Sequence, residues 1–82
     1  MMKRVELGPV AYRWLIRHRF ISETVIISIV QSTPKSSREY LNENHFVINF
    51  RRKKDGGYVK ITMWVKETTS TYFVYKLHSQ RL

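Results

Sequence analysis

The stretch HFVINFRRKKDGGYVKITMWVKETTSTYFVYKLH, residues 45–78, decides the fold, because apolar and polar side chains alternate along most of it. A period of two residues is typical of strands with one buried face. Asp55-Gly56-Gly57 predicts a hairpin turn, since glycine adopts positive φ without steric cost. Glu67-Thr68-Thr69-Ser70 predicts a second turn. The stretch therefore predicts an antiparallel β-meander.

The alternation assigns most residues of this meander to one of two faces. The inward face is predicted to hold Phe46, Ile48 and Phe50, then Val59, Ile61, Met63 and Val65, then Phe73, Tyr75 and Leu77. The outward face is predicted to hold Tyr58, Lys60, Thr62, Trp64 and Lys66, then Tyr72, Val74, Lys76 and His78. An apolar face opposite a polar one indicates a sheet packed on a core from one side.

Helical spacing predicts two helices before the meander. The first runs from Pro9, which suits a first turn, to about His18. Its buried stripe is predicted to be Val10, Ala11, Trp14, Leu15 and His18. The second covers residues 23–31 behind Ser22, a good N-cap. Its β-branched run also suits a buried strand, but the cap and the helical spacing favour a helix.

These elements predict a single α+β domain over residues 1–82, with two N-terminal helices packed on a three- to four-stranded antiparallel meander. The segment Met2–Leu7 is expected to be a short strand or an arm, and residues 32–37 a polar linker. A chain of 82 residues is too short for two independent cores. Homodimerisation would bury further apolar surface.

The charge of the chain points to an anionic partner. Fifteen Lys and Arg against six Asp and Glu give a net charge of +9, and these cations repel one another in the compact state. Nucleic acid is the first expectation, an acidic protein the second and an anionic membrane surface the third; a protein that is simply rich in Lys and Arg is the plain alternative. Cysteine is absent, which excludes disulfides and thiolate chemistry and fits a cytoplasmic protein. No apolar run approaches membrane-spanning length, so we expect no insertion across a membrane and no signal peptide.

Three basic groups are candidates for binding nucleic acid. The first is the outward face of the sheet, with Tyr58, Lys60, Trp64, Lys66, Tyr72 and Lys76, where cations would hold phosphates while bases stack on rings. The second is Arg51-Arg52-Lys53-Lys54, placed at a hairpin tip. The third is Arg13 and Arg17 on the first helix, with Arg19 after it. The alternatives are ordinary cross-strand aromatic pairs, a charged edge that blocks strand pairing, and a solvated helix face.

Catalysis would have to proceed without a metal ion. The three histidines lie far apart, and no carboxylate is spaced with them as a metal ligand, so we expect no metal and no cofactor. RNA cleavage needs neither, because His or Lys can activate a 2′-hydroxyl and Arg can stabilise the charge on phosphorus. Arg17, Lys76 and His78 are the candidates for these roles.

The segment Arg19-Phe20-Ile21-Ser22-Glu23, followed by Val25 and Ile29-Val30, resembles the R-G-I-S/T-E-x-x-V signature of a small prokaryotic domain family. That family is similar to BrnT-type toxins and lies near the RelE-like ribonucleases. The segment Thr71–Tyr75 resembles its closing T-x-Y strand. The resemblance implies helices followed by a short meander, a metal-independent endoribonuclease activity and an acidic antitoxin as partner. The chain departs from the family at Phe20, where the family has Gly, and at Ala11, where it has His.

The sequence therefore favours a small protein that binds RNA or DNA through a Lys/aromatic sheet face and an Arg-rich helix. The alternatives are a metal-independent endoribonuclease toxin of RelE/BrnT type and a non-catalytic interaction protein of a virus or mobile element. Whether the protein is an enzyme stays open at this level.

Overall fold

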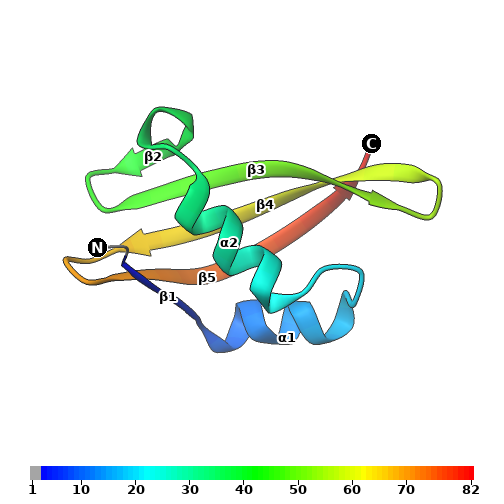
Figure 1. Ribbon diagram of the computed structural model, residues 1–82, viewed down its shortest axis with the longest axis horizontal. Helices are drawn as coiled ribbons and strands as arrows, with labels where there is room; N and C mark the ends of the chain where they lie inside the picture. Colours follow the sequence, from blue (N-terminus) through cyan, green and yellow to red (C-terminus); the bar gives the residue numbers. More distant parts are fainter. Residues whose placement is uncertain (1–2) are drawn as a thin grey trace.

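The computed structural model describes residues 3–82 and has an α+β fold (Figure 1). The elements in chain order are β1 (Arg4–Leu7), α1 (Pro9–Arg17), α2 (Glu23–Ser32), the 3₁₀ turn η1 (Lys35–Ser37), β2 (Glu39–Asn42), β3 (His45–Lys54), β4 (Gly57–Glu67) and β5 (Thr71–Arg81). The strands form one five-stranded sheet in the order β1-β5-β4-β3-β2. The predicted α+β class and both helices are confirmed. The predicted sheet of three to four antiparallel strands is wrong, because the sheet is mixed and has five strands.

Two short edge strands account for this difference. β1 pairs in parallel with β5, from Arg4 opposite Thr71 to Leu7 opposite Val74. The predicted strand or arm is thus a strand from Arg4, whereas Met2 lies outside the described residues. β2 pairs antiparallel with β3 over only four residues, most of them exposed. Such a short, exposed strand carries no clear alternation, so the sequence did not reveal it.

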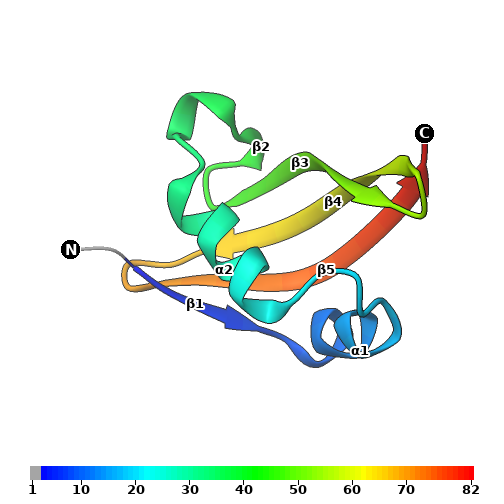
Figure 2. The same cartoon turned by 45° about the vertical axis from the view of Figure 1, so that its right-hand side comes forward.

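The helices supply one wall of the core. In α2, Ser22 Oγ accepts a hydrogen bond of 3.3 Å from the backbone N–H of Val25, which confirms the predicted N-cap. Ile26 and Val30 are fully buried against the sheet, so tertiary packing holds this β-branched run as a helix. Figure 2 shows α2 crossing the sheet while α1 follows the β5 side. Val10 of α1 is 57% exposed, so its predicted place in the buried stripe is wrong, whereas the predicted Ala11 and Leu15 are buried.

The long β3–β4 hairpin turns at Asp55 and Gly56, whose φ angles of 51° and 78° are the positive values that a type I′ turn requires. The predicted turn is confirmed. The basic run at residues 51–54 was predicted to sit at the hairpin tip, and it forms the last four residues of β3, directly before this turn. Strand geometry therefore sends its successive side chains to opposite faces.

A β-bulge in β5 reverses part of the predicted face assignment. Trp64 lies opposite Lys76, but Val65 lies opposite Val74, so Tyr75 is an extra residue on β5. Phe73 and Tyr75 were predicted to point inward, and Tyr72 and Val74 outward. These four assignments are wrong, because the extra residue shifts the alternation by one position. Beyond the bulge, the predicted faces hold.

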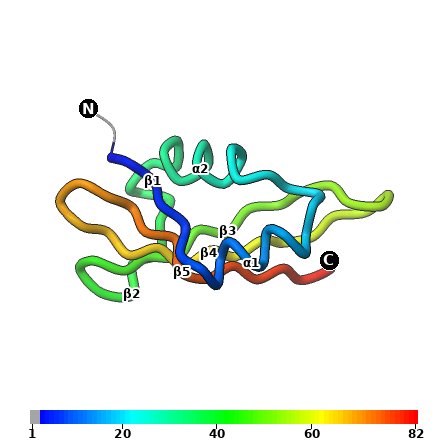
Figure 3. Tube along the Cα trace, turned by 90° about the horizontal axis from the view of Figure 1, so that it is seen from below, coloured from blue at the N-terminus to red at the C-terminus, as the bar shows by residue number. Residues whose placement is uncertain are grey.

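The core lies between the two helices and one face of the sheet. Figure 3 shows α2 on one side of the sheet. The buried members of the core are Ala11, Leu15, Ile21, Ile26, Val30, Phe46, Ile48, Val59, Ile61, Met63, Val65, Val74 and Leu77. The inward positions predicted for β4 are confirmed, as are Phe46, Ile48 and Leu77. Among residues 3–82, no helix has the length and apolar character needed to span a bilayer.

Candidate nucleic-acid interface

The face of the sheet opposite the core, called the outer face below, gathers basic and aromatic side chains. Strand register places on it His45, Val47, Asn49, Arg51 and Lys53 of β3, Tyr58, Lys60, Thr62, Trp64 and Lys66 of β4, and Phe73, Tyr75, Lys76, His78 and Gln80 of β5. The helices direct their buried residues to the other face. The outer face is therefore a surface built by strands alone.

The charge on the outer face is one-sided. Its permanent cations are Arg51, Lys53, Lys60, Lys66 and Lys76, and none of them forms an ion pair within residues 3–82. The carboxylates on this side lie at the two edge strands, where Glu6 is paired with Arg4 at 2.7 Å and Glu39 begins β2. A row of unpaired cations attracts a polyanion.

At the centre of the outer face, Trp64 lies opposite the bulge. The Nζ atom of Lys76 lies 4.7 Å from the centroid of the Trp64 ring, within the range of a cation–π contact. The Tyr75 ring meets the ring of His45 edge-on at a centroid distance of 5.9 Å. Val47, opposite Trp64, is only 7% exposed. The bulge thus places Tyr75 and Lys76 together on the same side, opposite Trp64.

Most residues of the first predicted basic group meet on the outer face. They are Tyr58, Lys60, Trp64, Lys66 and Lys76. Arg51 and Lys53 of the second group join them, whereas Arg52 and Lys54 take the alternate positions of β3. Lys54 Nζ instead lies 4.7 Å from the ring centroid of Phe20, next to the helices. Sequence reasoning missed Tyr75, because the bulge that turns it outward has no sequence signal in a strand that alternates regularly.

Tyr72 does not belong to the outer face, so its predicted placement there is wrong. Its ring packs against the core on the helix side, and its hydroxyl accepts a hydrogen bond of 3.0 Å from Arg38. The physical reason is again the bulge, which sits between Tyr72 and Lys76.

The third predicted basic group is divided between two hollows. Arg13 and Arg17 line a groove of about 230 Å³, called the α1 groove below, together with Val10, Trp14, His18 and Leu77. The Trp14 and His18 rings are stacked, with centroids 4.1 Å apart and planes 13° from parallel. Leu77 points to the core side and its neighbours Lys76 and His78 to the outer face, so the groove and the outer face lie on the two sides of β5.

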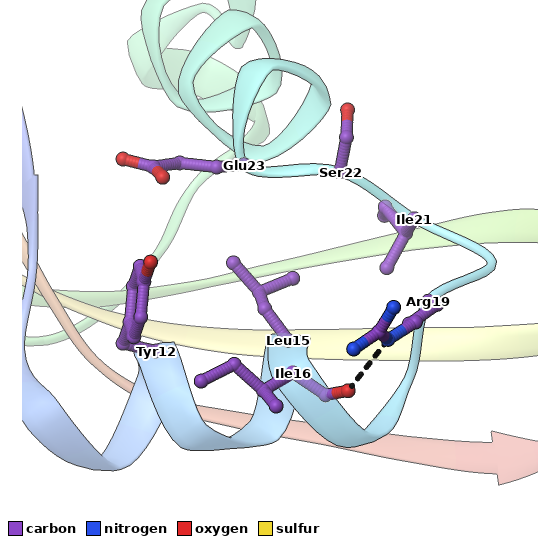
Figure 4. A pocket seen from close by; sticks show the side chains of 7 residues that line it. All are labelled: Tyr12, Leu15, Ile16, Arg19, Ile21, Ser22 and Glu23. Carbon is purple, nitrogen blue, oxygen red and sulfur yellow. Dashed lines mark hydrogen bonds between the residues drawn. The ribbon is translucent and has the colours of Figure 1, made fainter.

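Arg19 lies apart from Arg13 and Arg17, in the second hollow (Figure 4). Its Nε donates a hydrogen bond of 3.4 Å to the carbonyl oxygen of Ile16. This hollow, of about 260 Å³, is lined by Tyr12, Leu15, Ile16, Arg19, Ile21, Ser22 and Glu23. Its walls are largely apolar, and its two charged residues have opposite signs, so it does not extend the basic surface.

The candidate catalytic residues Arg17, Lys76 and His78 lie around one segment of β5. Lys76 and His78 share the outer face, and Arg17 lines the α1 groove with Leu77 between them. No carboxylate lines this groove. Among residues 3–82, no group of three or more His, Asp or Glu side chains is arranged to hold a metal ion.

A part-buried polar cluster on the core side of the sheet escaped the sequence analysis. The Arg38 side chain is only 8% exposed, and its guanidinium lies 4.6 Å from the Phe46 ring centroid and 4.9 Å from that of Tyr72. It donates hydrogen bonds to the hydroxyls of Tyr40, at 3.3 Å, and Tyr72, at 3.0 Å. This arrangement joins the α2–β2 connection to the sheet.

Glu67 completes this cluster as its only carboxylate. It is paired with Lys3 at 2.6 Å, accepts a hydrogen bond of 3.1 Å from the Tyr40 hydroxyl, and lies 3.9 Å from Arg38. Burial acts to raise the pKa of Glu67, but the hydrogen bonds from Lys3 and Tyr40 and the two nearby cations outweigh it and lower that pKa. Burial acts to lower the pKa of Arg38, but its hydrogen bonds with Tyr40 and Tyr72 outweigh this effect and raise that pKa. The groups of the cluster bond to one another, and only Arg38 Nε lacks a partner among the described residues, so we interpret the cluster as structural.

Comparisons of this chain with protein-family models, with curated proteins and with solved structures find no match.

Proposed function

We propose that this protein binds single-stranded nucleic acid across the outer face of its sheet. The observation that carries the proposal is the contact of Lys76 with Trp64 on a face with four further cations, none of the five being ion-paired within residues 3–82. An aromatic ring among cations matches a strand that offers both bases and phosphates. A sheet face also suits unstacked bases better than a duplex, whose major groove admits a helix or a two-stranded ribbon.

In this proposal the cations and the ring have separate tasks. Lys60, Lys66 and Arg51 neutralise phosphates and set the strand on the surface, independently of its sequence. A base stacks on Trp64 and displaces the Lys76 ammonium from the ring toward a phosphate. Stacking of one base on an aromatic side chain contributes about 1–3 kcal/mol. Binding of this kind is strongly dependent on salt, because counterions are released from the strand.

A second candidate function is metal-independent RNA cleavage, on an arrangement related to the RelE-like fold and with an acidic antitoxin as partner. It is favoured by the placement of Lys76 and His78 on one face, with Arg17 on the other side of Leu77. In this function His78, or Lys76 in its uncharged form, would take the proton of a 2′-hydroxyl as that oxygen attacks the adjacent phosphorus. The bond from phosphorus to the 5′-oxygen would break, the leaving oxygen would take a proton from the other of these two groups or from water, and Arg17 would stabilise the developing negative charge.

The test is fluorescence anisotropy with labelled 12-mers of single-stranded RNA, single-stranded DNA and duplex DNA, at low and at moderate salt. The ligand is checked on a denaturing gel afterwards. Trp64→Ala and Lys76→Ala are the variants, and Lys35→Ala is the control, because it removes one exposed cation on η1, outside the outer face.

We expect single strands to bind more tightly than the duplex, with an affinity that falls as salt rises. Trp64→Ala should weaken binding about 5- to 150-fold, which corresponds to the loss of about 1–3 kcal/mol of stacking. Lys35→Ala should change the affinity by less than the Lys76→Ala variant does. Absence of binding at low salt would overturn the proposal. RNA cleaved by the protein, but not by His78→Ala, would establish the second candidate instead.

A further inference from the structure

We propose that the α1 groove binds the phosphorylated end of a nucleic-acid strand whose following nucleotides cross the outer face. This inference rests on the proposed function and adds a specific site to it. The site consists of the Arg13 and Arg17 guanidinium groups and the stacked rings of Trp14 and His18, with Leu77 beside them.

The two arginines are positioned to act on one anion. They are four residues apart on α1, so their side chains leave the same face of the helix, about 5–6 Å apart at Cβ. Both are exposed, and neither is ion-paired within residues 3–82. Guanidinium groups bind phosphate oxygens in bidentate fashion, so two of them fit a phosphate with more than one charge.

A terminal phosphate fits this pair better than an internal one. A phosphate monoester carries about −1.5 to −2 charges at pH 7, whereas the diester that links two nucleotides carries one. No carboxylate lines the α1 groove to repel it. Trp14 and His18 are partly exposed and line the groove, so the outer sides of their stacked rings offer aromatic surface to the base next to that phosphate.

The size of the α1 groove limits its ligand to about one nucleotide. Its volume of about 230 Å³ is below the roughly 300–1,000 Å³ of pockets for drug-sized ligands. The remainder of a strand must therefore leave the groove. Leu77 points to the core side, whereas Lys76 and His78 belong to the outer face. A strand that leaves the groove therefore reaches Trp64 by passing the edge of β5 beyond Val74, where β1 no longer pairs with it.

The experiment compares three forms of one internally labelled single-stranded 12-mer: with a 5′-phosphate, with a 3′-phosphate, and with hydroxyls at both ends. The proteins are the parent chain, Arg13→Ala, Arg17→Ala, the charge-preserving Arg17→Lys, and Lys76→Ala. Circular dichroism reports whether α1 stays folded in each variant. As a second readout, adenosine monophosphate is titrated into a Trp64→Phe protein, whose remaining tryptophan is Trp14.

We expect one of the two phosphorylated 12-mers to bind at least about 5-fold more tightly than the 12-mer with hydroxyls at both ends. The other phosphorylated 12-mer should show no such gain. Arg13→Ala and Arg17→Ala should abolish the preference, Arg17→Lys should keep part of it, and Lys76→Ala should weaken all three ligands alike. Adenosine monophosphate should change the Trp14 fluorescence, and adenosine should not. Equal affinity for all three ligands, with salt-dependent binding retained, would overturn this inference and leave the proposed function standing. If the parent chain binds none of the three 12-mers, both this inference and the proposed function are overturned.

Discussion

Glu67 is the residue that most connects the separate parts of this small core. One carboxylate lies at hydrogen-bond or ion-pair distance from Lys3 before β1, from Arg38 before β2 and from Tyr40 within β2. The Arg38 guanidinium would otherwise be a buried charge with only hydroxyl partners, and its Nε already has no hydrogen-bond partner among the described residues. A buried charge that loses its counter-ion is costly. The edge strands therefore depend on this carboxylate.

Glu67→Gln should lower the free energy of unfolding by about 1–3 kcal/mol, because it removes the charge that compensates Lys3 and Arg38 while keeping the size of the side chain. Urea denaturation followed by circular dichroism measures this change. Glu39→Gln is the matched control, since Glu39 is exposed and forms no ion pair within residues 3–82. Equal effects of the two substitutions would contradict the role given to Glu67.

The same carboxylate should make the stability depend on pH. The pKa of Glu67 is lower in the folded protein than the ordinary value of 4.5, so the folded state binds fewer protons than the unfolded chain near that pH. Its contribution is therefore complete above pH 4.5 and is lost as pH falls through the lower folded pKa. The difference in unfolding free energy between the parent and Glu67→Gln, measured at pH 7 and then in steps below pH 4.5, should shrink toward zero. A difference that stays constant over this range would show that the charge is not responsible.

At the scale of the elements, the bulge in β5 decides which side chains reach the outer face. It turns Tyr75 outward beside Lys76 and returns Val74 to the core, where Val74 is fully buried. Uninterrupted alternation would instead place Val74 on the surface. A substitution at Val74 therefore tests whether β5 has the bulge or alternates without interruption.

Val74→Thr should destabilise the protein by about 1–3 kcal/mol, because it keeps the shape of the side chain but buries a hydroxyl without a partner. The same residue introduced by His78→Thr, at an exposed position of the same strand, should change the stability by less than about 0.5 kcal/mol. Thermal or urea unfolding distinguishes the two cases. If Val74→Thr is as mild as His78→Thr, the bulge lies elsewhere in β5.

The cap of α2 matters because the helix contains four isoleucines and valines between residues 25 and 29, together with Val30, and such residues have low helix propensity. Ser22→Ala should cost about 0.5–2 kcal/mol, toward the lower end because the capping hydrogen bond is long at 3.3 Å. Ser36→Ala in η1 is the control, since no hydrogen bond of that hydroxyl is present among residues 3–82. Urea midpoints compare the two. A loss for Ser36→Ala as large as that for Ser22→Ala would argue against the cap.

At the scale of the whole molecule, the charge of +9 acts on folding and on binding in opposite directions. Repulsion among cations opposes the compact state, and salt screens it. Raising sodium chloride from about 0.05 to 0.5 M should therefore raise the urea midpoint of the free protein while it weakens oligonucleotide binding. Denaturation curves and anisotropy at matched salt concentrations test both. A urea midpoint that falls with salt would mean that ion pairs such as that of Lys3 with Glu67 outweigh the repulsion.

Local chemistry was sufficient to predict several parts of the fold. The turn at Asp55 and Gly56, the cap at Ser22 and the inward residues of β4 each depend on neighbours in the chain, and the structure has all three. The same holds for the placement of Trp64, Lys60 and Lys66 on one side, because strand alternation is a local property. The sequence by itself therefore determined the α+β class, the helices, the central hairpin and half of the candidate interface.

Only the tertiary structure decided the features that join distant segments. β1 becomes a strand because β5 offers it an edge 67 positions later in the chain, from Arg4 to Thr71. The bulge at Tyr75 exists only relative to the partner strand, and the Arg38–Glu67 cluster gathers side chains from both ends of the sequence. The α1 groove likewise requires α1 to lie beside Leu77. The register between segments so far apart in the chain depends on how the whole core packs, and the local alternation of apolar and polar residues does not specify it.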